Sequence, residues 1–421
     1  MKELLHRLCF SISWMTVGLF NLYGIPIQAE ETVAQTIAEL EQIALAHHPV
    51  LMAKQQRITS LNGLWIQEGL APNPEVGYVA EEITSGNMGK QGVEFSQEIV
   101  TRNKLTHAQE VVCREIEVAK ESLKMAEWKV RTDVRVAAFA FLVADRKKTL
   151  HQELVQINES IYQMTQSLYS KGEVTKLDLL NMGMELEKSR TELVSAQNDH
   201  QAAWKELACV LGTPDMPPVT ITDTLECQPN LLSWDAFAQV LLETSPEIAR
   251  AQAAIQQAQK KLELENARNS SNLTVGGGIM YNTESHATQV GLGVSVPLRI
   301  RDRNQGNIAS ARSEVLAAHQ EYDRILLNVQ QRLADVYRRY ASACENLQKY
   351  RDKILPQAKE SLQLARSGYE HGELNYLDLL NSQQTFASMY LLYLDNLQEY
   401  WTYKTILEGK LLTGCLEDGL E

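Results

Sequence analysis

One segment of this chain occurs twice. Residues 171–181 read KGEVTKLDLLN and residues 371–381 read HGELNYLDLLN, so seven of eleven positions agree at an offset of 200. The match extends in both directions at nearly the same offset, with Ser96 aligned to Ser295 and Arg102 to Arg301. This duplication restricts the fold more than any other feature, because each half must contain the same elements in the same order.

The order of those elements follows from the spacing of apolar residues. In the first repeat, residues 30–214, we predict a helix over 31–70, strands at 76–82 and 92–99, and a long helical hairpin over 103–211. The rest of the chain is expected to contain, in order, a linker at 215–232, a second repeat at 233–414 with strands at 273–281 and 289–298 and a hairpin over 304–412, and a tail at 415–421. The predicted fold class is mostly α, with internally duplicated long hairpins and four amphipathic strands in each chain.

The strands of the second repeat alternate most clearly. Val290, Leu292, Val294 and Val296 alternate with polar or very small residues, so one face of this strand is apolar. A tilted strand needs about 9 to 11 residues to cross a bilayer, and in that interpretation these four side chains face lipid. A half-buried hairpin of a soluble protein alternates in the same way, so the strands alone leave both interpretations open.

The helical segments are longer than a globular domain needs. Residues 103–170 contain no proline and residues 304–367 contain only Pro356, so each helix could reach roughly 95–100 Å. Apolar or small residues recur along the second helix in steps of three and four with one stutter, which is typical of a coiled-coil seam. The seam positions are Ile308, Ala311, Val315, Ala318, Tyr322, Ile325, Val329, Leu333, Val336, Tyr340, Ala343, Leu347, Tyr350 and Ile354. The duplicated turn is then the tip of each hairpin, where Gly172 and Gly372 supply a left-handed residue.

Composition and motifs exclude several classes of protein. With 44% apolar and 22% charged residues the chain is neither disordered nor a polytopic helical membrane protein, and a net charge of −13 argues against a nucleic-acid partner. Motifs of metalloproteases, serine hydrolases and P-loop enzymes do not occur, so we expect no enzyme, no cofactor and no metal site. His47 and His48 are interpreted as part of a helix surface.

The first 29 residues differ from the rest. Lys2 and Arg7 precede an uncharged stretch from Leu8 to Ala29, which predicts a secretory signal peptide over 1–29, with an uncleaved anchor helix as the alternative. If the strands then cross a membrane, several chains must combine them, because four strands cannot close a barrel and open edges are not tolerated in lipid. A secreted chain of this design spans the outer membrane of a bacterium with two membranes and extends deep into the periplasm.

With these features together, the sequence resembles the outer-membrane efflux protein (TolC) family over residues 30–414. The strongest evidence is the pair of tip segments and GVSVPLRIRDRNQGNIASAR at 293–312; the latter, with APNPEVGYVAEE at 71–82, is most similar to the heavy-metal branch that serves cobalt–zinc–cadmium exporters. The resemblance implies a homotrimer with a twelve-stranded outer-membrane barrel in contact with lipid, continued by an α-helical periplasmic tunnel. It also implies a periplasmic adaptor (membrane fusion protein) and an inner-membrane pump of the resistance-nodulation-division type.

The resemblance further implies roles for residues at the tips. In the family an aspartate six residues after the tip glycine narrows the periplasmic entrance, and the same count here gives Asp378 and Asp178. A second aspartate and an arginine of the family pattern are replaced by Asn381 and Leu374, so the usual closing network is in doubt. The two aspartates can also be ordinary first-turn acids, which the helix dipole favours. The tip residues expected to contact the adaptor are Gly172, Glu173, Gly372 and Glu373.

The function implied by the resemblance is passive exit through the outer membrane for substrates of a tripartite efflux pump, with heavy-metal cations as the expected cargo. Organic toxicants or secreted polypeptides are alternative cargoes, since one architecture can carry several functions. A soluble periplasmic coiled-coil scaffold or adaptor is an alternative of a different class.

Overall fold

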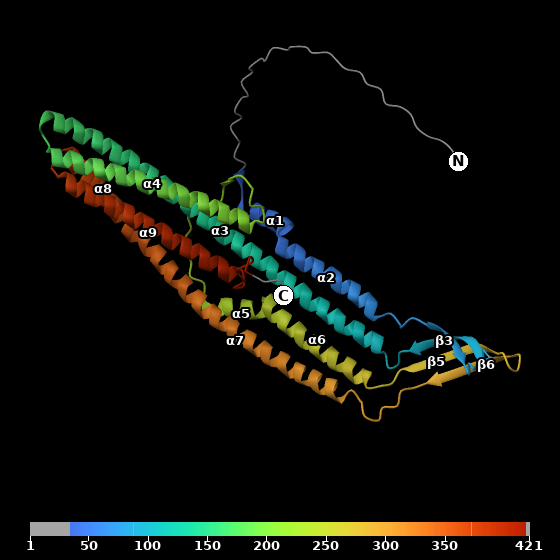
Figure 1. The fold of residues 1–421 in the computed structure, drawn as a ribbon. Helices are drawn as coiled ribbons and strands as arrows, with labels where there is room; N and C mark the ends of the chain where they lie inside the picture. The colour runs from blue at the N-terminus through green and yellow to red at the C-terminus, as the bar shows by residue number, and fades with distance from the viewer. Residues whose placement is uncertain (1–33, 87, 372, 418–421) are drawn as a thin grey trace, which may run out of the picture.

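The structure, a computed structural model, describes residues 34–86, 88–371 and 373–417; the signal peptide predicted over 1–29 lies outside them. The chain forms a long stack of helices with a four-stranded sheet at one end (Figure 1). The helices of the first repeat are α1 (Ile37–His47), α2 (Pro49–Glu68), α3 (Lys104–Lys171) and α4 (Lys176–Val210). Those of the second repeat are α5 (Trp234–Thr244), α6 (Pro246–Arg268), α7 (Gln305–Lys349), α8 (Leu355–Glu370) and α9 (Tyr376–Glu408).

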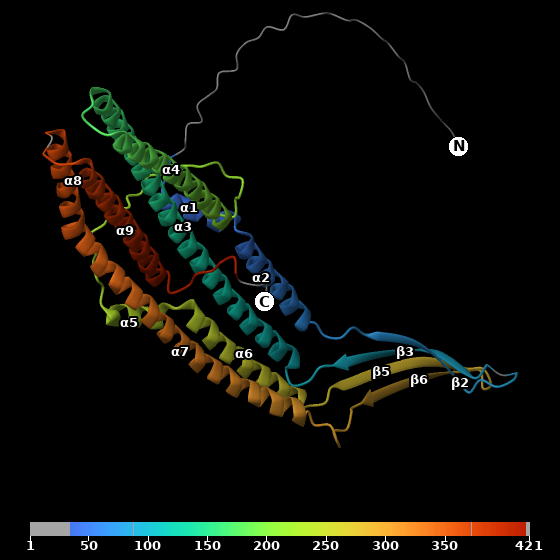
Figure 2. The same ribbon diagram turned by 60° about the vertical axis from the view of Figure 1, so that its left-hand side comes forward.

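The two repeats run side by side along one axis (Figures 1 and 2). The 68 residues of α3 extend about 100 Å, from the sheet to the far end, where the chain returns as α4. In the second repeat α7 and α8 together run the same way, and α9 returns. The predicted fold class, mostly helical with duplicated long hairpins and four strands, is confirmed.

Each repeat starts with two helices separated by a break. The sequence predicted one continuous helix over 31–70, and this is wrong, because the chain breaks at His48, where φ is −67° and ψ is 122°. Ser245 has nearly the same dihedrals, −67° and 121°, and both residues precede a proline, which disfavours the helical conformation of the residue before it. The interpretation of His48 as a surface residue is also wrong, since the break leaves it completely buried.

A π-helical turn, Tyr350–Ile354, joins α7 to α8. Pro356 follows in the first turn of α8, and an ordinary helix would bring its ring against the carbonyl four residues earlier. In the π turn the N–H of Leu355 donates to the carbonyl of Tyr350, and this wider spacing accommodates the proline. No interruption occurs within α3, so the long arms of the two hairpins differ.

The predicted seam of the second hairpin faces the protein interior. None of its positions is exposed, and half of them are buried. The buried positions are Ala311, Ile325, Val329, Leu333, Tyr340, Ala343 and Leu347. Near the middle of the stack, Tyr340 stacks on Tyr400 of α9 with ring centroids 5.8 Å apart. Among the described helices, none is long and apolar enough to cross a membrane.

The sheet consists of antiparallel strands in the order β2-β3-β5-β6. Its strands are β2 (Glu75–Glu81), β3 (Lys90–Ile99), β5 (Leu273–Asn282) and β6 (Ala287–Ser295). A separate short parallel pair joins β1 (Ala34–Gln35) to β4 (Thr220–Ile221). The strands of the two repeats thus form one continuous sheet, with β3 and β5 paired at its centre.

The register places unlike residues on the two faces of the sheet, because residues paired across strands share a face. One row of partners is apolar and consists of Tyr78, Val93, Ile279 and Val290. The next row, on the opposite face, is small and acidic and consists of Gly77, Glu94, Gly278 and Gly291. On the apolar face the side chain of Leu292 is 91% exposed in the single chain. A continuous apolar surface therefore lies open along the outside of the four strands.

Strand β6 ends earlier than predicted. It stops at Ser295, before Pro297, so the predicted boundary at 298 is wrong and Val296 lies outside the strand. Proline lacks the N–H that a ladder requires, which explains why pairing ends there. Val290, Leu292 and Val294 remain within the strand, and all three are exposed on its apolar face.

Candidate functional site

The residues that the sequence singled out lie at opposite ends of the molecule. The apolar residues of β6 lie in the sheet, and the two tip segments lie at the far end of the hairpins, where α3 meets α4 and α8 meets α9 (Figure 2). The site therefore has two parts, a sheet and a pair of hairpin tips, connected by the helical stack.

The first tip contains the left-handed residue that the sequence predicted. Gly172 has φ of 76° and ψ of 16°, and its N–H donates to the carbonyl of Tyr169 at 3.0 Å. The N–H of Glu173 donates to the carbonyl of Leu168 at 3.0 Å, which closes the end of α3 in the manner of a Schellman motif. At the second tip the N–H of Glu373 donates to the carbonyl of Gly368 at 2.8 Å, while Gly372 lies outside the described residues.

Asp178 belongs to a capping box at the start of α4. Its Oδ2 accepts from the N–H of Thr175 at 2.9 Å and from the Thr175 hydroxyl at 2.7 Å, while its own N–H donates to Thr175 Oγ1 at 3.2 Å. The hydroxyl and the N–H of Thr175 lower the pKa of this carboxyl below its usual value. Since the charged form is the one favoured by folding, the stabilisation is present above the unfolded pKa of roughly 4 and is lost as pH falls through the lower folded value.

Asp378, the equivalent residue at the second tip, has a different environment. The N-cap of α9 is Asn375, whose Oδ1 accepts from the N–H of Asp378 at 3.0 Å. Within the described part of the chain, the Asp378 carboxylate makes no hydrogen bond or ion pair, and it is exposed. Asn381 is exposed one turn further along α9. The replacement of Thr175 by Asn375 in the second repeat thus leaves one of the two aspartates with an unpartnered charge.

The two hairpins contact each other just behind their tips. Met182 of α4 and Leu379 of α9 are both buried, and they form a small apolar cluster with Ile161 of α3 and Ala365 of α8. Leu379 directly follows Asp378 in the sequence, so packing of the leucine fixes where the helix presents the aspartate. The same cluster holds Tyr376, and burial raises the pKa of its hydroxyl to about 12.

A buried polar network, which was not predicted from the sequence, also connects the hairpins. Asn158 Nδ2 of α3 donates to Ser189 Oγ of α4 at 2.5 Å, and Gln383 Nε2 of α9 donates to Asn158 Oδ1 at 2.9 Å. Nearby, Gln384 Nε2 donates to Glu185 Oε1 at 3.2 Å. A polar residue at a helix position that should be apolar is the signal that could have indicated it, as for Asn158 on α3.

We expect Gly172→Val to disturb the first tip and Gly172→Asn to be tolerated. A β-branched residue resists the left-handed conformation, at a cost of roughly 1–2 kcal/mol, whereas asparagine adopts it readily. Open space surrounds Gly172, so the backbone and not a clash determines the outcome. Limited proteolysis of the purified protein measures the effect: cleavage near residue 172 should accelerate in the valine variant. Equal cleavage rates in the two variants would contradict this assignment.

A sheet with one apolar face and one small, acidic face, continued by a helical stack about 100 Å long, defines a channel subunit of the outer membrane. The family model described as outer membrane efflux protein matches residues 40–213 and 237–402. The chain belongs to this family, and the two matched segments correspond to its two repeats.

The chain is similar to heavy-metal and secretion proteins. It is 25% identical over 358 residues to the cobalt-zinc-cadmium resistance protein CzcC of Cupriavidus metallidurans, covering 85% of each chain. The cation efflux system protein CusC of Escherichia coli K12 is 22% identical over 216 residues, 48% of this chain and 46% of the relative. The alkaline protease secretion protein AprF of Pseudomonas aeruginosa is 21% identical over 241 residues, 54% of this chain and 50% of the relative.

Solved structures share the fold. A crystal structure of CusC superimposes with a TM-score of 0.72 at 18% identity, covering 91% of this chain and 93% of the other. The outer membrane protein VceC of Vibrio cholerae gives a TM-score of 0.68 at 19% identity, with 90% and 96% covered. Both comparisons show that this chain shares its fold with these two proteins.

Proposed function

We propose that this chain is the outer-membrane duct of a tripartite efflux pump, that three copies close its barrel, and that its cargo is heavy-metal cations. The observation that carries the proposal is the exposed sheet. Among the described residues, β2 and β6 at its edges each pair on one side only, and the apolar face between them is open. In a membrane the apolar face can contact lipid, but the unpaired N–H and C=O groups of the two edge strands have no water there to hydrogen-bond. Strands of other chains must therefore pair with these edges.

Three chains satisfy this requirement in the simplest way. Each contributes four strands, the β6 edge of one chain pairs with the β2 edge of the next, and twelve strands close into a ring. The apolar residues of β6 then face lipid, and Glu94 with its glycine neighbours faces the lumen. A soluble scaffold, the alternative of another class, leaves the exposed apolar face without a purpose.

The hairpin tips, at the end of the molecule opposite the sheet, are proposed to connect the duct to the rest of the pump. In this proposal the stack crosses the periplasm, Gly172, Glu173, Gly372 and Glu373 contact a periplasmic adaptor, and an inner-membrane pump delivers the cargo. The exposed Asp378, with Asn381 on the same face of α9, borders the entrance.

Two observations support a cationic cargo. CzcC, which matches this chain over 85% of its length, is named for cobalt, zinc and cadmium resistance. The cation efflux protein CusC is similar to this chain in both sequence and fold. The chain itself is acidic, with a net charge of −13 and acidic residues on the proposed lumen face of the sheet and at the second tip. The similarity to AprF makes polypeptide export the second candidate, over about half of the chain.

Deletion of the gene tests the cargo. We expect the deletion strain to lose tolerance to zinc, cobalt or cadmium salts, with tolerance restored by the intact gene carried on a plasmid. Growth on organic toxicants and the amount of secreted protein are measured in the same strains. Loss of protein secretion with unchanged metal tolerance would favour polypeptide export instead.

Chemical cross-linking in isolated outer membranes tests the assembly. The expected largest product is a trimer, because two complementary edges per chain close at three copies when twelve strands form the ring. Only monomers or dimers, obtained at cross-linker concentrations that saturate the reaction, would contradict a shared barrel.

A further inference from the structure

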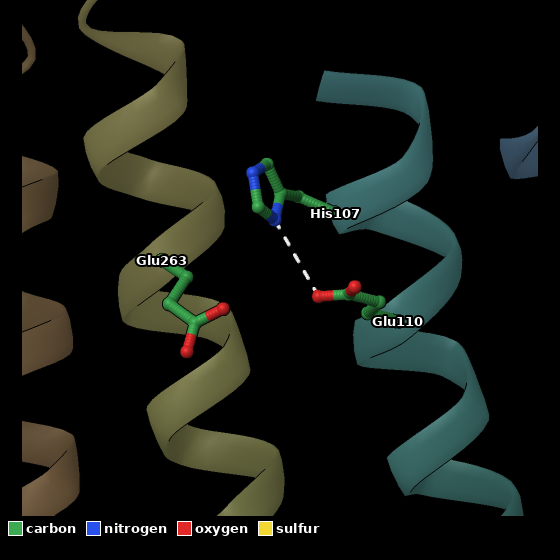
Figure 3. Close-up of side chains that lie close together, drawn as sticks. All are labelled: His107, Glu110 and Glu263. Carbon is green, nitrogen blue, oxygen red and sulfur yellow. Dashed lines mark ion pairs between the residues drawn. The ribbon is translucent and has the colours of Figure 1, made fainter. Parts of the chain in front are cut away.

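A histidine and two glutamates gather between the two repeats, close to the sheet. His107 and Glu110 lie one turn apart near the start of α3, and Glu263 projects toward them from α6 (Figure 3). One ligand atom from each residue lies within 4.8 Å of the other two. No metal site was expected from the sequence, because Glu263 follows His107 and Glu110 by more than 150 positions and no motif joins the three residues.

The spacing of the first two residues is compatible with a coordination site. His107 Nδ1 and Glu110 Oε2 are 3.5 Å apart. Two ligands bound tetrahedrally at about 2.1 Å from a zinc ion are separated by roughly 3.4 Å. Both atoms are shielded from solvent. The carboxylate oxygen also lies within ion-pair distance of a lysine, Lys260 of α6.

Lys260 of α6 is the cation that balances the cluster. Its Nζ lies 3.2 Å from Glu110 Oε2 and 2.8 Å from Glu263 Oε2. With a neutral imidazole, two carboxylates and one ammonium leave a net charge of −1, whereas two carboxylates and a divalent cation are neutral. The lysine side chain is 29% exposed on a flexible stem, so it can turn to solvent when a metal takes its place.

We propose that His107, Glu110 and Glu263 bind a divalent transition-metal cation of the zinc or cobalt class in exchange for the Lys260 ammonium. One imidazole and two carboxylates suit these ions, and three protein ligands leave a coordination position for water. Competition with the lysine makes the site exchangeable. A bound cation connects α3 of the first repeat to α6 of the second, just below the sheet. The proposal does not depend on what the duct exports.

Calorimetric titration of the detergent-solubilised protein, without a histidine tag, with zinc chloride tests the site. We expect one cation per chain, with affinity at least about tenfold weaker in His107→Ala and Glu263→Gln, since even partners outside the ligand shell contribute that much. Lys260→Met should instead bind zinc more tightly, by about tenfold, because it removes the competing cation without removing a ligand. Zinc should raise the unfolding temperature of the wild type and more so that of Lys260→Met.

Matched controls lie nearby. Lys261, the next residue, pairs with Glu314 at 2.6 Å, so Lys261→Met removes an equal charge from the same helix without touching the cluster. His151 pairs with Glu192 elsewhere, so His151→Ala removes another histidine. Both controls should bind zinc as the wild type does. Unchanged affinity in Glu263→Gln or in Lys260→Met, with oligomeric state preserved, would overturn the proposal, as would the absence of zinc binding in both wild type and Lys260→Met.

Discussion

Leu292→Arg should eliminate the assembled protein from the outer membrane, whereas Gly293→Arg should leave it there. The two residues are neighbours on β6 with side chains on opposite faces, so the pair compares the lipid side of the proposed barrel with its lumen. Arginine at the lipid midplane of a barrel costs roughly 2–4 kcal/mol, and three copies of the chain multiply that cost. An arginine on the lumen side remains in water.

The measurement is recovery of a heat-sensitive oligomer from the outer-membrane fraction, with total expression as the reference. Gly293 suits the comparison because no atom lies within 4 Å of a Cβ added there, so a side chain can begin at that position without a clash. Gly277 is unsuitable for this comparison, since a Cβ there would lie 2.9 Å from the Leu292 side chain. Equal recovery of Leu292→Arg and Gly293→Arg would show that the apolar face does not contact lipid.

Asp378→Asn should lower the preference of the channel for cations, and it should do so more than Asp178→Asn does. In the proposed trimer three Asp378 carboxylates surround the entrance with their charge unpartnered, and such a ring concentrates cations at the pore. Asp178 is also ionised, but two hydrogen bonds from Thr175 hold its carboxylate against the start of α4, so its substitution disturbs that helix start as well. Single-channel reversal potentials in a salt gradient measure the preference.

The salt dependence separates an electrostatic effect from a structural one. Screening reduces the range of charge interactions from about 10 Å at 0.1 M to about 3 Å at 1 M salt, so wild type and Asp378→Asn should converge as salt rises. If both aspartate variants lose selectivity equally, or neither does while the channel still conducts, the two carboxylates are helix-start residues and nothing more.

Much of the architecture could be predicted because it depends on repeated local patterns. The spacing of apolar residues by three and four positions along α7 predicted which side of that helix is buried. The alternation of apolar with polar or small residues predicted the apolar face of β6. What failed were positions where a proline acts on its neighbours. Pro49 breaks the first helix and buries His48. Pro297 was expected to mark the end of a strand, but β6 stops two residues before it and leaves out Val296. These effects depend on one residue, so an averaged periodicity does not show them.

The site could be predicted only where one segment contains it. The tips were found because each lies within eleven residues, although the difference between Thr175 and Asn375 that separates their aspartates depends on side-chain hydrogen bonds. The buried Asn158 network and the cluster around Glu263 combine residues from both repeats. Only the packing of one repeat against the other brings them together.

The π-helical turn at Tyr350–Ile354 gives the two repeats different mechanics. Its hydrogen bonds span a wider loop than those of the uninterrupted α3, so bending should concentrate there. In the proposed trimer, six similar hairpins would then line the tunnel. Three stiff hairpins from the first repeats would alternate with three from the second repeats that can bend at the π turn. The movements of such a tunnel would have threefold and not sixfold symmetry. The three hairpins that can bend are the ones that carry Asp378, whose carboxylate is unpartnered.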